Sequence, residues 1–144
     1  MNKGLKDGFL KFADLSVGQC TEKEVTWSSI ERAIFSDLFA DKAPVHFEPE
    51  FAARLGYKQP ILFGLLLVSG FSGLLGEVLP GALSVIHNVR FDFVSPGFLD
   101  IPLVYRLEIV RLSPATKAVI LRAEIKDSNG KIYVRGQIQC GLTE

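Results

Sequence analysis

The sequence has few of the residues from which metal sites, disulfide frameworks and charged docking surfaces are built. Its 144 residues include two cysteines and two histidines, and Lys plus Arg equals Asp plus Glu at 16 each. Cys20 and Cys140 are too far apart for a zinc motif or a dense disulfide framework, so we expect reduced thiols. Balanced charge gives no net attraction to nucleic acid or to an anionic membrane. We therefore expect no metal, no other cofactor, no nucleic-acid partner and no membrane partner.

Motifs of other enzyme classes are missing as well. The nearest approach to a G-x-S-x-G elbow is GFSG at 70–73, and no Walker loop occurs. His46 and His87 lack metal-ligand spacing. Since His87 stands just before a predicted strand, we expect it to face solvent or to cap a hydrogen bond.

Two segments bear on membranes and secretion. The N-terminal MNKGLKDGFLKFADL has no continuous apolar stretch and no small-residue cleavage site, so we expect no secretory signal and a cytoplasmic protein. The uncharged run from 59 to 76 is nearly long enough to span a bilayer. Its glycines lower helix propensity, and no second span follows. We interpret it as a helix from Pro60 to Leu79 that protein surrounds on every side.

The residues before this helix predict short elements. Residues 19–27 alternate weakly between two faces, as in a strand. Ser28 and Glu31 have capping-box spacing and open a predicted helix. A second short helix is expected from 49 to 56, and the polar segment 41–47 is a loop between the two helices. The apolar face of the first helix consists of Ile30, Ala33, Ile34 and Leu38.

The C-terminal half alternates apolar and polar residues with the period of β-strands. Four strands are expected, with a hairpin turn at 127–130. Short connections favour an antiparallel meander, and no linker divides residues 1–144. The residues expected to face inward are Val89, Phe91, Phe93, Leu103, Tyr105, Leu107, Ile109, Val119, Leu121, Ala123, Ile125, Ile132, Val134, Ile138 and Cys140. Small residues at 69, 72, 73 and 76 share one face of the apolar helix and would let a sheet or a partner helix approach it closely. The sequence thus predicts one α+β domain, an antiparallel sheet curled around one buried helix.

The loop at 41–47 holds the candidate chemistry. Asp41 and His46 precede the apolar helix, and loops on rigid scaffolds often carry functional groups. A carboxylate and an imidazole form a usable acid/base pair near neutral pH. The same two residues also suit a merely solvated surface loop, so spacing alone leaves both interpretations open.

The segment FSDLFADKAPVHFEPEFA closely resembles the signature of the MaoC-like, hydratase-2 family of (R)-specific enoyl thioester hydratases. The matching positions are Phe35, Leu38, Asp41, Pro44, Val45, His46 and Ala52. Ala40 replaces the signature's Gly, and Ala43 replaces its Asn. The stretches QPILFGLLLVSGFSGLLGEVLPG and VRFDFVSPGFLD are similar to the family's central helix and the strand that follows. Phe63 replaces a His that is usual before the helical Gly64.

The resemblance implies a hotdog fold, a sheet wrapped around a long central helix, paired into a homodimer. It implies that Asp41 and His46 hold one water against a trans-2-enoyl thioester and add it across C2 and C3 to give the (R)-3-hydroxyacyl product; dehydration is the reverse. Gly64 would supply a backbone N–H to the thioester oxygen, while Phe63 and Ser72 would contact substrate. The carrier is either coenzyme A or acyl carrier protein. A thioesterase on the same fold remains an alternative, since it too needs a carboxylate and helix-end N–H groups around a thioester. Because of Ala43 and Phe63, so does a non-catalytic acyl-thioester binder.

Overall fold

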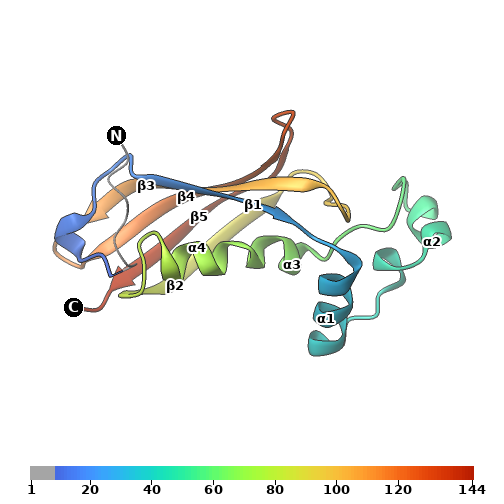
Figure 1. Cartoon of the computed structure of the whole chain (residues 1–144), viewed down its shortest axis with the longest axis horizontal. Coiled ribbons are helices and arrows are strands. Elements are labelled where there is room, and N and C mark those ends of the chain that lie inside the picture. The colour runs from blue at the N-terminus through green and yellow to red at the C-terminus, as the bar shows by residue number, and fades with distance from the viewer. Residues whose placement is uncertain (1–8) are drawn as a thin grey trace.

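A computed structural model describes residues 9–144 (Figure 1). The expectation about a secretory signal falls largely on residues 1–8, which lie outside the described residues. The elements in chain order are η1 (Phe12–Asp14), β1 (Cys20–Thr26), α1 (Ser29–Phe39), η2 (Pro44–His46), α2 (Pro49–Arg54), α3 (Gly64–Ser69), α4 (Phe71–Glu77), β2 (Ser84–Phe93), β3 (Pro102–Ser113), β4 (Ala118–Asp127) and β5 (Ile132–Leu142).

The five strands form one antiparallel sheet in the order β1-β3-β4-β5-β2. Strands β3, β4 and β5 form the expected meander, but the prediction that β2 would precede them in it was wrong, because β2 pairs with β5 instead of β3. The segment between β2 and β3 is no hairpin turn. The N–H of Asp100 in this segment donates to the Trp27 carbonyl at 2.8 Å, so the chain crosses the end of the sheet to reach β1.

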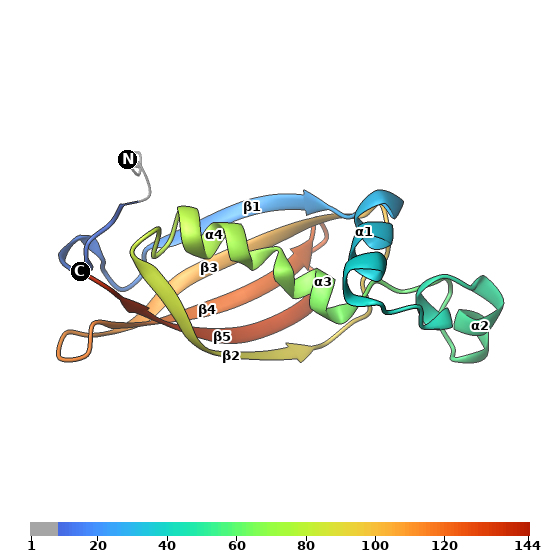
Figure 2. The ribbon, with the colours of Figure 1, turned by 90° about the horizontal axis from the view of Figure 1, so that it is seen from below.

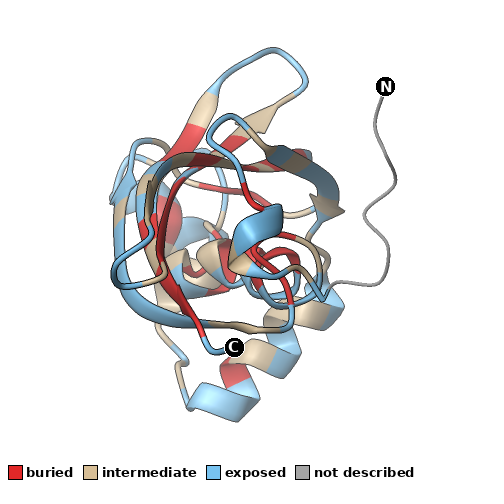
Figure 3. Ribbon diagram, turned by 90° about the vertical axis from the view of Figure 1, so that its left-hand side faces the viewer, coloured by how far each residue is buried: buried red, intermediate tan, exposed pale blue. Residues whose placement is uncertain are grey.

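Helices α3 and α4 lie along the inner, curved face of the sheet (Figure 2), while α1 and α2 lie beyond one end of it. The predicted inward residues of β3 and β4 are buried, as are Val134, Ile138 and Cys140 of β5. Buried positions concentrate in the sheet and the helix that it encloses (Figure 3). In β2 the prediction was wrong at Val89 and Phe93, which are about half exposed because β2 is an edge strand with a neighbouring strand on one side only.

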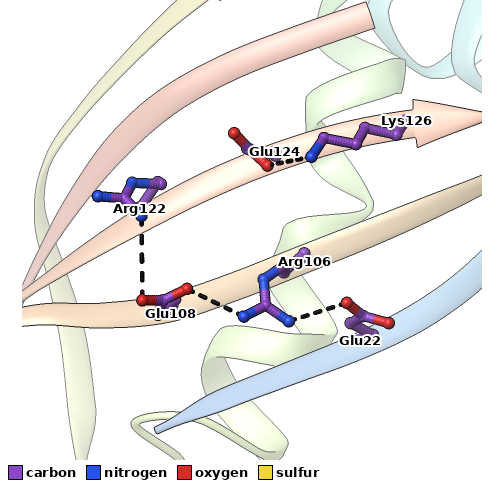
Figure 4. A network of polar contacts seen from close by, with 6 residues as sticks. All are labelled: Glu22, Arg106, Glu108, Arg122, Glu124 and Lys126. Carbon is purple, nitrogen blue, oxygen red and sulfur yellow. Dashed lines mark hydrogen bonds and ion pairs between the residues drawn. The ribbon is translucent and has the colours of Figure 1, made fainter. Parts of the chain in front are cut away.

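The outer face of the sheet is polar, which explains why the helix packs on the other side. Arg106 on β3 contacts Glu22 on β1 and Glu108, each at 2.9 Å (Figure 4). Arg122 on β4 lies 3.9 Å from Glu108. These groups are partly solvated, so each pair adds little stability, but together they keep this face in water.

The central helix differs from its prediction in its start and its continuity. It begins at Gly64 instead of Pro60, because the N–H groups of Ile61 and Leu62 pair with the carbonyls of Val45 and Gly97 at 3.2 and 2.8 Å and hold this segment extended. It is also divided into α3 and α4 at Gly70.

One side of this helix is exposed, so the prediction of a helix buried on every side was wrong. Leu65 is 71% exposed, and Ser69, Ser72, Gly73 and Gly76 are exposed beside it. The sheet covers only the opposite side, which carries Leu66, Leu67, Phe71, Leu74 and Leu75. In the described part of the chain, no helix has the length and apolar character needed to cross a membrane.

Candidate active site

The loop after α1 begins with a left-handed turn. Ala40 caps the helix with φ 54° and ψ 30°. The N–H of Asp41 then donates to the Ser36 carbonyl at 3.2 Å, and the N–H of Ala43 donates to the Asp41 carboxylate at 3.0 Å. The backbone of the loop therefore orients this carboxylate, whatever side chain stands at position 43.

The imidazole of His46 is fixed in orientation and in tautomer. Its Nδ1 lies 2.8 Å from the carbonyl oxygen of Ile61. A carbonyl only accepts, so in the neutral ring Nδ1 carries the proton and Nε2 keeps a free lone pair. The Phe63 ring packs against the imidazole with centroids 4.0 Å apart. His46 thus presents a proton acceptor from a half-buried, packed position.

Ile61 connects this loop to the start of the central helix. Its N–H donates to Val45 and its carbonyl accepts from His46, so the two segments are joined by a pair of hydrogen bonds. Gly64, three residues later, is the first residue of α3. The N–H groups at the start of a helix have no partner within the helix. The free N–H donors at the start of α3 and the acceptor nitrogen of His46 are therefore brought together at the junction of the loop and the helix.

A cavity of about 350 Å³ lies at this junction. Its wall is mostly apolar with a few polar groups, the composition typical of a small-molecule site. It is lined by His46, Tyr57, Ile61, Leu62, Gly64, Leu67, Phe93, Val94, Ser95, Pro96 and Gly97. The site is hence assembled from the loop, the start of α3 and the end of β2.

The residues singled out from the sequence are not all in one place. His46 and Gly64 line the cavity, and Phe63 is buried behind the imidazole, only 2% exposed. Asp41 begins the same loop but is not among the lining residues. Ser72 is exposed on α4, two helical turns beyond Gly64, and does not line this cavity either.

Several residues of the site had no signal in the sequence. Tyr57 and Ser95 line the cavity, and Arg32 and Ser36 on α1 contact the backbone of the loop. Ser36 and Ser95 lie within segments that resemble the family, but at positions that the resemblance did not single out, whereas Arg32 and Tyr57 lie outside those segments. The contacts of Arg32 and Ser36 depend on how α1 packs beside the loop.

Among residues 9–144, no group of three or more His, Cys, Asp or Glu side chains is arranged to hold a metal ion. The second histidine, His87, is exposed as predicted, but it lies within β2 instead of just before the strand.

The sequence matches the family model described as "MaoC like domain" over residues 15–126. It is 33% identical over 123 residues to the (R)-specific enoyl-CoA hydratase of Aeromonas caviae, covering 85% of this chain and 92% of that protein. It is 30% identical over 107 residues to the 3-hydroxybutyryl-CoA dehydratase of Methylorubrum extorquens, covering 73% and 67% of the two chains.

Solved structures agree with this result. The (R)-hydratase from A. caviae superposes with a TM-score of 0.84 at 32% identity, over 90% of this chain and 98% of the other. An R-hydratase from Pseudomonas aeruginosa in the unliganded form gives a TM-score of 0.83 at 26% identity, over 92% and 85%.

Proposed function

The chain belongs to the MaoC-like domain family, and on that premise we propose that it is a hydro-lyase acting on acyl thioesters of coenzyme A. Two relatives at 30% identity or more are named as an (R)-specific enoyl-CoA hydratase and a 3-hydroxybutyryl-CoA dehydratase. Hydration of an enoyl-CoA and dehydration of a 3-hydroxyacyl-CoA are the two directions of one reaction. The family's hotdog architecture is present throughout the described residues.

We further propose (R)-specific hydration of trans-2-enoyl thioesters, or its reverse, with Asp41 and His46 as the acid/base pair. The observation that supports this most directly is the His46–Ile61 hydrogen bond, which leaves Nε2 free beside an apolar cavity. Nε2 of His46 accepts a proton from the water as the hydroxyl oxygen bonds to C3, while the Asp41 carboxylate accepts a hydrogen bond from the same water and orients it. The imidazolium so formed then donates that proton to C2, so the C2–C3 double bond becomes a single bond and both side chains end in the protonation states in which they began.

Gly64 has a separate role in this proposal. Its backbone N–H at the start of α3 would donate to the thioester oxygen, where negative charge develops as C3 is attacked. A Cβ at this position would lie 3.1 Å from the Phe93 ring, so the absence of a side chain also keeps the cavity wall open. Phe63 packs against His46, and the substrate contacts expected of Phe63 and Ser72 stay predictions.

Under this proposal, neither departure from the signature removes a group that the reaction needs. The Ala43 N–H, which any residue except proline supplies, orients the Asp41 carboxylate. Phe63 replaces a second imidazole with a ring that buries one side of His46. That substitution is also the observation that favours the second candidate, a protein that binds acyl thioesters without turnover.

The test is a turnover screen of crotonyl, octenoyl and longer enoyl thioesters on coenzyme A and on acyl carrier protein. Asp41→Asn and His46→Gln should each reduce loss of enoyl-thioester absorbance by about 10²- to 10⁴-fold, the usual size of acid/base assistance. The matched controls are Asp37→Asn and His87→Gln, which change the same residue types at exposed positions.

Equal rates in the site variants and the wild type would sink the assignment of the pair. Release of free thiol would indicate a thioesterase, and binding without turnover on any chain length would support the non-catalytic alternative. Melting temperatures of all four variants establish that the fold is unchanged.

We also propose that the chain acts as a homodimer paired through β2. The two edges of the sheet differ: β1 exposes Glu22, Lys23 and Glu24, whereas β2 exposes the apolar Val85, Ile86, Val89 and Phe93 together with Arg90 and Asp92. Charged edge strands resist pairing, and apolar ones invite it. Because Phe93 and Val94 also line the cavity, a partner on this edge would cover its open side.

A further inference from the structure

Two side chains of α1 reach the backbone of the loop at the residues proposed as the acid/base pair. The Ser36 hydroxyl donates to the Asp41 carbonyl at 2.7 Å, and Nη1 of Arg32 donates to the His46 carbonyl at 3.0 Å. Arg32 and Ser36 are four residues apart, so they stand on the same side of the helix, one turn from each other. One surface of α1 thus holds both ends of the loop.

Ser36 is a buried polar residue with a defined partner. It is 1% exposed, and it is the only buried polar or charged residue in the described part of the chain. Its carbonyl accepts from the Asp41 N–H while its hydroxyl donates to the Asp41 carbonyl. Both backbone polar groups of Asp41 are therefore bonded to Ser36.

The environment of Arg32 would suit an apolar side chain better than an arginine if stability were its only role. Its guanidinium carbon lies 5.0 Å from the centroid of the Phe47 ring, and no carboxylate pairs with it within residues 9–144. Its Nε is buried without a hydrogen-bond partner in the same range. A buried donor without a hydrogen-bond partner lowers the stability of the fold by the free energy of removing it from water. An apolar side chain would pack on Phe47 without that penalty.

We propose that Arg32 and Ser36 are positioning residues that hold the backbone of Asp41 and His46 in the geometry needed for turnover. This inference rests on the proposed function, in which those two side chains act on one water. Two other sets of bonds hold the loop as well: the Asp41 N–H donates to the Ser36 carbonyl at 3.2 Å, and Ile61 pairs with Val45 and His46. Without the two α1 side chains, the end of the loop at His46 would keep its bond to Ile61 but lose its hydrogen bond to α1, and the end at Asp41 would keep only one of its two backbone bonds to Ser36.

An exposed ion pair between the same two segments provides the contrast. Lys42 of the loop contacts Asp37 of α1, but their side chains are 64% and 77% exposed. Exposed pairs contribute little to order or stability. Removing this contact should therefore leave turnover unchanged, although it also joins α1 to the loop.

The experiment compares Arg32→Met, Arg32→Lys, Ser36→Ala and the control Asp37→Asn with the wild type, using crotonyl-CoA as substrate. We expect kcat to fall about 10- to 100-fold in Arg32→Met and Ser36→Ala with KM within about threefold, because misplacement of a reacting group by 1 Å costs about 10²-fold. Arg32→Lys, which keeps a donor, should recover part of the loss. The melting temperature of Arg32→Met should not fall, since the variant removes an unsatisfied donor.

Amide hydrogen exchange of residues 41–47 provides a readout that is independent of turnover. Exchange should be faster in Arg32→Met and Ser36→Ala than in the wild type and Asp37→Asn, with β3 and β4 unchanged. Unchanged exchange in both site variants would overturn the inference, as would a loss of activity that lies wholly in KM. If the wild type hydrates no enoyl thioester, the proposed function fails, and the exchange comparison alone decides whether α1 positions the loop.

Discussion

Ala40 is a residue whose backbone conformation conflicts with its side chain. It ends α1 in the left-handed region, with φ 54°, at the position where the family signature has Gly. A Cβ makes this region unfavourable by about 1 kcal/mol or slightly more. The N–H of Ala40 still donates to the Ser36 carbonyl, so the helix end is formed despite the strain.

We expect Ala40→Gly to raise the free energy of unfolding by up to about 1 kcal/mol, because glycine adopts this conformation without steric conflict. The gain is limited because glycine also increases the conformational entropy of the unfolded chain. Urea denaturation followed by circular dichroism measures the change. Ala33→Gly, within the same helix, is the control and should destabilise by about 1 kcal/mol. Destabilisation of similar size in both variants would contradict the strain at Ala40.

At the scale of elements, the break between α3 and α4 is set by a strand. The Tyr105 ring of β3 lies where a side chain at Gly70 would be, since a Cβ there would meet Tyr105 Cε1 at 2.5 Å. The Tyr105 hydroxyl donates to the Leu67 carbonyl at 2.6 Å and accepts from the Trp27 indole at 2.8 Å. Burial raises the pKa of Tyr105, so the hydroxyl stays a donor at all ordinary pH values.

Gly70→Ala should therefore destabilise the fold by about 1 to 3 kcal/mol, the usual cost of overpacking a core. The same substitution in a Tyr105→Leu background should cost less, because the smaller side chain leaves room for the added methyl group. A double-mutant cycle from thermal unfolding measures this coupling. Equal costs in both backgrounds would show that the ring does not set the helix break.

At the scale of the whole molecule, the exposed edge of β2 and the uncovered side of the central helix are two of the apolar surfaces that one copy leaves unpaired; a third is the face of α1 with Ile30, Ile34 and Leu38. A partner that extends the sheet at β2 would place the two central helices on the same side of a longer sheet. The small residues at 69, 72, 73 and 76 would then permit close approach, as the sequence predicted for a partner helix.

We expect sedimentation equilibrium to give about twice the chain mass of 15.9 kDa. Val89→Lys should shift the protein toward monomer, since an inserted charge on an edge strand opposes pairing. Thr21→Lys on β1 is the matched control and should leave the mass unchanged. A monomeric wild type, or equal dissociation by both variants, would contradict pairing through β2.

A single cooperative unfolding transition would agree with the further prediction that residues 1–144 form one domain.

The sequence by itself determined the strands β3, β4 and β5, the cap of α1 and the placement of the Asp41–His46 loop between two helices. These features follow from local patterns: side-chain alternation with period two, the Ser28–Glu31 capping box, and helix-breaking residues. The resemblance to the MaoC-like family supplied the identities of the candidate acid and base, which spacing alone left open.

Only the tertiary structure decided where β2 pairs, where the central helix starts and breaks, and which groups hold the loop. Each depends on residues distant in sequence. The Gly97 carbonyl holds Leu62 extended, so that the helix starts at Gly64, and the Tyr105 ring occupies the space beside the break at Gly70. Helix α1 supplies Arg32 and Ser36. A local pattern records the preference of a segment for helix or strand. It holds no information about the partner that a carbonyl or a ring meets after folding, so these contacts could not be derived before the chain was seen in three dimensions.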